Sequence, residues 1–234
     1  MQQTKILGII GGVGPLATWD LAKQVTHFTQ AETDQEHIRI LIDSNTSIPD
    51  RTQAILHGGP SPVPQILESA RLLEKAGADF LAMPCNTGHY YHAEVAQAID
   101  IPFLHMIDEV GKELQRQGAQ HVAVLATDGT RQTDIYADVL ARHGVQTFYP
   151  DDEWQKFVVS IIYDYVKAGN MDFPEQRIRA LVEELHSQGA EKIVLGCTEL
   201  PVAFDAIGLR ENIVSATDVL AKAIVLTAGK QIRL

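Results

Sequence analysis

The sequence lacks any cluster of basic residues, and its overall charge is strongly acidic. Its 19 lysines and arginines are outnumbered by 30 aspartates and glutamates, which gives a formal net charge of -11. Proteins that bind nucleic acids need clustered cations to neutralise phosphates. We therefore expect no nucleic-acid partner. An anionic ligand must be met by a few local cations against an unfavourable overall field.

Long apolar runs are also missing. None reaches the roughly 18–20 residues that a membrane helix needs, so we expect no membrane partner. The apolar stretch near the N-terminus, LGIIGG, follows a single lysine and ends in glycines rather than at a small-residue cleavage site. That pattern predicts a first strand rather than a signal peptide. We expect a cytoplasmic protein.

Cysteine is scarce, because the 234 residues contain only Cys85 and Cys197. A structural disulfide between them is not expected in a reducing compartment. Buried cysteines are common in protein cores, and this is the ordinary interpretation for either residue taken alone. The pair needs a further explanation.

The chain also lacks the usual motifs for cofactors and metals. The glycine-rich segment Gly8–Gly14 has no Gly-Lys-Ser/Thr and does not have the dinucleotide spacing. We expect instead a backbone loop that encloses a substrate at Gly12. His89 and His92 stand three residues apart, a spacing that metal sites use, but no further cysteine or carboxylate stands at ligand spacing. We predict no metal site.

Short β-branched runs alternate with longer amphipathic stretches, which is typical of α/β proteins with parallel sheets. Strands are expected at 5–10, 38–42, 79–83, 101–105, 121–126, 146–149, 192–195 and 213–215. Helices are expected at 18–29, 66–77, 107–117, 133–143, 154–168, 175–187 and 218–228. The segment Ser44–Pro64, rich in Gly, Pro, Ser and Thr, is predicted to be a long functional loop.

The two halves of the sequence are related. Gly77–Thr87 (GADFLAMPCNT) aligns without gaps to Gly189–Glu199 (GAEKIVLGCTE), at an offset of 197 − 85 = 112 residues. We infer two Rossmann-like, doubly wound α/β domains related by pseudo-twofold symmetry. The first comprises 1–106 and 217–234 and carries Cys85, and the second comprises 107–216 and carries Cys197. Such symmetry would place the two cysteines opposite each other across an interdomain cleft, the expected active site.

Each cysteine follows a buried strand and precedes an expected helix. It should therefore lie at the carboxyl edge of its sheet, where open α/β sheets bind ligands. The positive end of a helix dipole favours a thiolate there. Because the two cysteines occupy equivalent positions, we favour a joint chemical role over two unrelated core positions.

Two equivalent thiols suit a racemase, which removes the α-proton from one face of a carbon and returns a proton to the other. The carbanion-like transition state spreads charge into the α-carboxylate, so preorganised hydrogen-bond donors are needed. Candidates are the backbone amides of Asn86, Thr87 and Gly88, and those of Thr198 and Glu199.

Three motifs in order, GGVGPLAT at 11–18, PCNT at 84–87 and GCTE at 196–199, resemble the aspartate racemase branch of the aspartate/glutamate racemase family. The resemblance covers nearly the whole chain. It implies two α/β domains, an active site in the cleft, no pyridoxal phosphate or metal, and a homodimer. It also implies that Cys85 serves the D-enantiomer and Cys197 the L-enantiomer of an acidic amino acid.

The resemblance extends to further residues. Arg51, in PDRT, matches an arginine that binds a substrate carboxylate, and a guanidinium can grip a carboxylate with two hydrogen bonds. Lys167, in YDYVKAG, matches a lysine that faces the substrate. Thr127 and Thr130 match a threonine loop opposite the first glycine loop. For Arg51 and Lys167 the alternative is a solvated surface charge.

Departures from the related glutamate racemases favour aspartate. Gly11-Gly12 stands where those enzymes have an Asp-Ser-Gly loop, and Glu199 stands where they have histidine. Val13 replaces the usual methionine of the first loop and leaves the side-chain preference open. The alternatives are a racemase of other or broader range (glutamate, homoserine, hydantoins), a non-catalytic small-ligand binding protein, and a redox switch that joins the cysteines.

Overall fold

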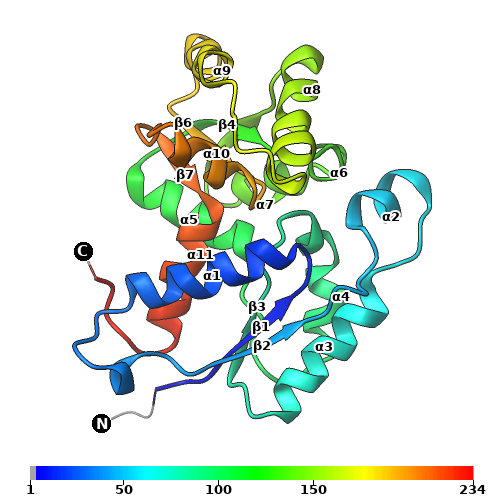
Figure 1. Cartoon of the computed structure of the whole chain (residues 1–234), viewed down its shortest axis with the longest axis vertical. Coiled ribbons are helices and arrows are strands. Elements are labelled where there is room, and N and C mark those ends of the chain that lie inside the picture. The colour runs from blue at the N-terminus through cyan, green and yellow to red at the C-terminus, as the bar shows by residue number, and fades with distance from the viewer. Residues whose placement is uncertain (1–3, 234) are drawn as a thin grey trace. The chain divides into compact units, whose positions relative to one another are not determined.

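The chain forms two compact α/β units (Figure 1), of which the computed structural model describes residues 4–233. Unit 1 comprises Met1–Glu109 and Thr217–Leu234, and unit 2 comprises Val110–Ala216. Each unit has its own parallel sheet. The predicted α/β class with two parallel sheets is confirmed.

The sheet of unit 1 has the order β2-β1-β3. Its strands are β1 (Leu7–Gly11), β2 (Ile40–Ser44) and β3 (Phe80–Ala82), and all pairs are parallel. Residues of β1 and β3 are buried throughout, as expected for strands covered on both faces. Because all three strands are parallel, their carboxyl ends lie at the same edge of the sheet.

Helices cover both faces of this sheet. The connections from β1 to β2 and from β2 to β3 run in opposite directions across the sheet, so right-handed crossovers place α1 (Pro15–Phe28) and α3 (Val63–Lys75) on opposite faces (Figure 1). The apolar stripe of α3 includes Ile66, Ala70 and Leu73. The other helices of this part of the chain are η1 (Asp34–Glu36), α2 (Arg51–His57), η2 (Thr87–Tyr91), α4 (His92–Ala96) and α11 (Ala216–Thr227).

The segment Ser44–Pro64 is not a continuous loop, because it contains the helix α2. Asp50 caps this helix by accepting a hydrogen bond from the Gln53 amide at 2.7 Å. Gly58 ends it with a φ of 64°, a left-handed conformation that glycine adopts without strain. The prediction of a long loop was wrong here because the weight given to Gly, Pro and Ser hid a seven-residue helix with regular caps.

The strand expected at 101–105 was also wrong. Only one isolated parallel bridge joins Leu81 to Phe103, flanked by hydrogen bonds of Leu81 with Pro102 and Leu104. Pro102 has no N–H to donate, and the Phe103 carbonyl accepts a hydrogen bond from a ring nitrogen of His92 at 2.9 Å. The segment is therefore tied to side chains as much as to the sheet.

Unit 2 repeats the strand order of unit 1 and adds a fourth strand. Its sheet has the order β5-β4-β6-β7, all parallel. The strands are β4 (His121–Leu125), β5 (Gln146–Phe148), β6 (Lys192–Leu195) and β7 (Ile213–Ser215). In both sheets the first strand lies between the second and the third, as a duplicated half predicts.

The helices of this half differ from the expected ones in several places. They are α5 (Met106–Gln117), α6 (Asp128–Gln132), α7 (Ile135–Ala141), α8 (Asp152–Ser160), the π-helix η3 (Ile161–Lys167), α9 (Glu175–Ser187) and α10 (Leu200–Ala206). The helix expected at 133–143 is shorter in the structure, because α7 begins only after Asp134, whose φ of 49° is left-handed. The short helix α6 lies entirely before the expected range. The helix expected at 154–168 widens into the π-helix after Ser160.

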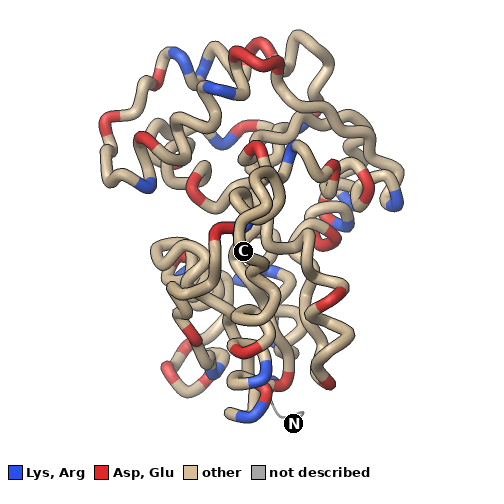
Figure 2. The backbone as a smooth tube through the Cα atoms, turned by 90° about the vertical axis from the view of Figure 1, so that its right-hand side faces the viewer, with Lys and Arg blue, Asp and Glu red and all other residues tan. Residues whose placement is uncertain are grey.

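Acidic and basic residues are interspersed along both units (Figure 2), and no long basic stretch occurs in the part of the chain that the structure describes. Within residues 4–233, no helix combines the length and hydropathy needed to cross a bilayer.

Candidate active site

Cys85 follows β3 and is buried, with 7% of its surface exposed. Asn86, Thr87 and Gly88 come next and are buried as well, where η2 begins. A Cβ atom at Gly88 would lie 3.3 Å from Cys85 Sγ and 2.7 Å from Met83 Cε. Only glycine lets the backbone pass so close to the sulfur.

The side chain of His89 holds the turn at Cys85 through a hydrogen bond to the backbone. Its Nδ1 lies 2.8 Å from the Cys85 carbonyl oxygen, so Nδ1 carries the hydrogen and donates it. Burial, with the nearby His105, lowers the pKa of His89 to about 3, and the ring is therefore neutral near pH 7. His89, His92, His105 and Phe103 pack ring against ring. Among the described residues no group of histidine, cysteine or carboxylate side chains is arranged to hold a metal.

The lowered pKa of His89 predicts a pH-dependent stability. The unfolded chain takes up a proton on this histidine near pH 6.5, but the folded chain does so only near pH 3. Protonation therefore favours the unfolded chain between these values. The free energy of unfolding is unaffected by His89 above pH 6.5 and decreases as the pH falls towards 3. At pH 5 the loss is about 2 kcal/mol. We expect His89→Gln to show a smaller drop in melting temperature between pH 7 and pH 5 than the wild type.

The matched control for this measurement is His27→Gln, which changes an exposed histidine of α1. Its melting temperature should fall with pH as steeply as that of the wild type. An equal pH dependence in His89→Gln and the wild type would contradict the assignment.

Gly12 and Arg51 lie beyond the ends of β1 and β2, at the same edge of the sheet of unit 1. Gly12 has a φ of 81°, and a Cβ atom there would collide with the backbone of Asn45. Its amide donates to Thr18 Oγ1 at 3.0 Å. The guanidinium of Arg51 donates to the carbonyls of Val13 at 3.2 Å and Pro49 at 3.1 Å. Arg51 thereby joins the glycine loop to the start of α2.

Unit 2 places a second group of candidate residues at the end of β4. Thr127 caps α6, with its Oγ1 accepting from the Thr130 amide at 3.3 Å, and both threonines are buried. Gln155 of α8 donates to the Ala126 carbonyl at 3.0 Å and to Asp128 Oδ1 at 2.8 Å. Sequence reasoning missed Gln155. The available signal was an amide on a helix face that otherwise carries Phe157, Val158 and Ile161.

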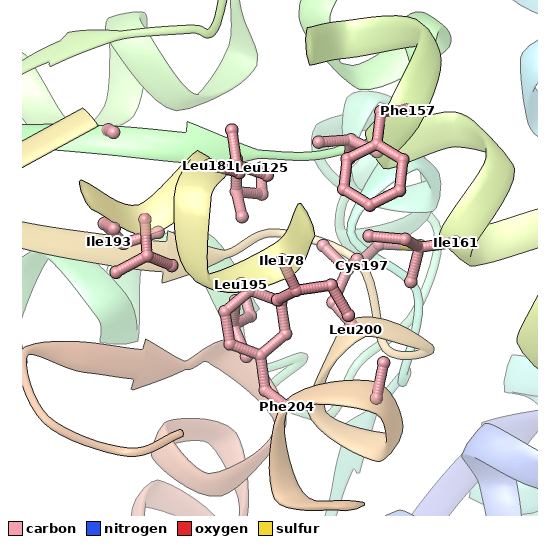
Figure 3. Close-up of a cluster of buried hydrophobic side chains, with 14 of the residues drawn as sticks. Leu125, Phe157, Ile161, Ile178, Leu181, Ile193, Leu195, Cys197, Leu200 and Phe204 are labelled. Atoms are coloured by element: carbon pink, nitrogen blue, oxygen red, sulfur yellow. The ribbon is translucent and has the colours of Figure 1, made fainter. Parts of the chain in front are cut away.

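Cys197 follows β6 in the same way as Cys85 follows β3. It is 8% exposed and belongs to an apolar cluster with Ile161, Ile178 and Leu200 (Figure 3). Gly196 precedes it, and its amide donates to the Leu125 carbonyl at 2.8 Å. The cluster fixes the position of the thiol, and Thr198 and Glu199 then lead the chain into α10.

Glu199 connects Cys197 to Lys167. The Cys197 thiol donates to Glu199 Oε2 at 3.0 Å, and the hydroxyl of Thr198 donates to the same oxygen at 3.2 Å. The ammonium of Lys167 lies 2.6 Å from the other oxygen, Oε1. Sequence reasoning assigned Lys167 and Glu199 separately to the substrate and did not anticipate that they contact each other.

The electrostatics of this group favour a proton on sulfur. Burial and the Glu199 carboxylate raise the pKa of the Cys197 thiol well above its ordinary value. Burial alone would raise the pKa of Glu199, but the charge of Lys167 and the hydrogen bonds from Cys197, Lys167 and Thr198 together lower it. In the resting state a neutral thiol therefore contacts one oxygen of the carboxylate, and the ammonium contacts the other.

The structure thus gathers the predicted site residues into two groups, each on the carboxyl side of one sheet. Unit 1 contributes Gly12, Arg51, Cys85, Asn86, Thr87 and Gly88, and unit 2 contributes Thr127, Thr130, Lys167, Cys197, Thr198 and Glu199.

Comparisons with known proteins agree on one family. The family model described as Asp/Glu/Hydantoin racemase matches residues 10–224. The broad specificity amino-acid racemase RacX of Bacillus subtilis (strain 168) is 32% identical over 226 residues, which are 95% of this chain and 97% of that protein.

Two solved structures resemble the chain over nearly its whole length. The aspartate racemase of Picrophilus torridus has a TM-score of 0.83 at 32% identity, with 98% of this chain and 96% of that chain covered. An aspartate racemase homologue from Pyrococcus horikoshii OT3 has a TM-score of 0.79 at 25% identity, with 97% and 100% covered.

Proposed function

Because the chain belongs to the Asp/Glu/Hydantoin racemase family, we propose that it interconverts L- and D-aspartate without a cofactor, with Cys85 and Cys197 as its two acid–base groups. The observation that carries the proposal is the equivalence of these cysteines. Each follows the third strand of a sheet with the same strand order, and each is buried beside polar residues at the carboxyl edge. A core position alone would not require this correspondence.

In the proposed reaction one thiolate removes the α-proton and the opposing thiol returns a proton to the other face. The roles exchange when the reaction runs in the other direction. Following the resemblance, Cys197 takes the proton from L-aspartate and Cys85 takes it from D-aspartate. Both sulfurs must then come within reach of one α-carbon.

The α-proton of an amino acid is a weak acid, so the carbanion-like transition state needs hydrogen-bond donors on its carboxylate. We assign that role to Arg51 and to the backbone amides at the start of η2, which are buried beside Cys85. Arg51 is held by the Val13 and Pro49 carbonyls, so its fork is positioned before a substrate arrives.

A broader substrate range is the second candidate. The broad specificity racemase RacX and the aspartate racemase of Picrophilus torridus are both 32% identical to this chain. The sequence identities therefore do not favour a broad substrate range over specificity for aspartate. Measured rates on aspartate, glutamate, homoserine and hydantoins would decide between the two.

The proposal predicts inversion with solvent hydrogen. In D2O and without pyridoxal phosphate, L-aspartate should yield D-aspartate that carries deuterium at the α-carbon, because the returned proton comes from a thiol that exchanges with solvent. Chiral chromatography and NMR measure the two changes.

The control is a Cys85→Ala/Cys197→Ala double variant purified in the same way, which reveals any contaminating racemase. Absence of both inversion and α-deuterium with aspartate and with the wider panel would refute the proposed function.

A further inference from the structure

Glu199 is shared between a proton donor and a cation. One of its oxygens accepts from the Cys197 thiol at 3.0 Å, and the other contacts the Lys167 ammonium at 2.6 Å. All three side chains belong to unit 2. A proton that leaves the sulfur therefore has a carboxylate acceptor at hydrogen-bond distance, and the charge of Lys167 is the largest of the influences that lower the pKa of that carboxyl group.

We propose that Glu199 is the proton acceptor of Cys197, and that a substrate carboxylate switches it on by drawing Lys167 away. This inference rests on the proposed racemase function and specifies how one of its two thiols is activated. It makes Glu199 a catalytic residue, because it touches the reacting sulfur, and Lys167 a positioning residue that acts through Glu199.

The exposures of the two charged side chains support this direction of events. The side chain of Lys167 is 35% exposed, whereas that of Glu199 is 11% exposed. An incoming carboxylate can therefore meet the ammonium without displacing Glu199. The protein is acidic overall, so a local cation of this kind is what an anionic substrate needs.

Lys167 lies at the end of the π-helix η3. The seven residues of this helix continue α8 with a wider turn. π-Helical turns are rare and are frequent at functional sites. The lysine lies 32 residues before Glu199 in the sequence, and the ring of Tyr163, one turn earlier, lies 5.8 Å from its ammonium.

Removing the cation brings the proton affinities of sulfur and carboxylate closer together. Lys167 is the strongest of the influences that lower the pKa of Glu199, whereas it is the weakest of the contributions to the pKa of Cys197. When Lys167 turns to a substrate, the pKa of Glu199 rises more than that of the thiol. Proton transfer from Sγ to Oε2 then becomes less unfavourable.

The protons balance over one turnover from L-aspartate. Cys197 gives its proton to Glu199 and becomes a thiolate, which takes the α-proton and is a thiol again. Cys85 gives its proton to the opposite face of the α-carbon and becomes a thiolate. The cycle closes when Glu199 releases its proton to solvent and Cys85 takes one up.

The experiment uses the full chain with Cys85→Ser, in which Cys197 is the only remaining thiol because the chain has two cysteines. The thiolate signal is the rate at which a small neutral alkylating reagent modifies Cys197, because this rate is proportional to the thiolate fraction. It is recorded near neutral pH with and without saturating succinate, whose binding is confirmed by calorimetry. A neighbouring cation shifts a carboxyl pKa by about one to three units, so we expect succinate to raise the thiolate signal about tenfold. No net proton should be released into an unbuffered solution, because the proton moves to Glu199.

Three further variants in this background sharpen the result. Glu199→Gln should abolish the rise. Lys167→Met should show the raised thiolate signal before succinate is added and no further rise after it. Glu175→Gln is the matched control, because it removes a carboxylate that pairs with Arg179 at 2.8 Å on α9, and it should respond as the parent does. Cys85→Ala serves as a second background and should give the same pattern.

The inference is overturned if succinate binds without changing the thiolate signal, if the rise persists in Glu199→Gln, or if neither succinate nor L-aspartate binds to the Cys85→Ser chain. In each case racemisation by the wild type shows that the proposed function still stands. If the wild type racemises nothing in the panel, the proposed function itself has failed, whatever the titration gives.

Discussion

Cys197→Ala should lose racemisation by a factor of about 10² to 10⁴, the usual contribution of a general acid or base, yet still exchange the α-proton of D-aspartate with solvent. Cys85→Ala should show the opposite pattern and exchange only L-aspartate. The reason is that each variant keeps one thiol, which can remove a proton from its own face and return solvent deuterium to the same face. Inversion needs both thiols.

Two measurements in D2O separate these outcomes. NMR follows loss of the α-proton from each pure enantiomer, and chiral chromatography follows formation of the other enantiomer. Both cysteines are buried, but each substitution removes only one sulfur atom and leaves a small cavity. Circular dichroism checks that each variant remains folded. If either variant racemises within about tenfold of the wild type, a two-base assignment that expects about 10² or more from each thiol is excluded.

The sequence predicted the parts of the fold that depend on local pattern. The apolar runs at β1, β3, β4 and β6 predicted strands, and each of these strands is buried except for His121 and Lys192 at the starts of β4 and β6. The repeat around the cysteines predicted two similar sheets, and the shared strand order agrees with it. Such strands can be recognised from the sequence because a strand that is buried on both faces has a nearly continuous run of apolar residues.

Features that depend on contacts distant in sequence were not predictable in this way. The pairing of Lys167 with Glu199 joins residues 32 apart, and Gln155 meets the Ala126 carbonyl over 29 residues. The carbonyl of Phe103, in the segment where a strand was expected, accepts a hydrogen bond from the ring of His92, 11 residues earlier. No periodicity of 2 or 3.6 encodes such contacts.

Arg51→Ala should lower kcat/KM for aspartate by about a hundredfold, because hydrogen bonds to charged groups contribute roughly 1.5–3 kcal/mol each and tenfold corresponds to about 1.4 kcal/mol. The kcat/KM of Arg51→Lys should lie between those of Arg51→Ala and the wild type, since lysine keeps the charge but lacks the planar guanidinium. Steady-state rates on L-aspartate and L-alanine measure the effect. The assignment of Arg51 to the α-carboxylate predicts an equal loss on both substrates. A larger loss on aspartate than on alanine would instead assign Arg51 to the side-chain carboxylate.

A purely structural role of Arg51 is the competing explanation, because the guanidinium also donates to the Val13 and Pro49 carbonyls. Loosening these loops would lower kcat and the melting temperature together, whereas loss of a carboxylate ligand lowers kcat/KM and leaves the melting temperature nearly unchanged. Arg71→Ala, which removes an exposed arginine of α3, is the matched control and should behave as the wild type. If Arg51→Ala keeps the KM of the wild type while kcat and melting temperature fall together, Arg51 supports the loops and does not bind the substrate.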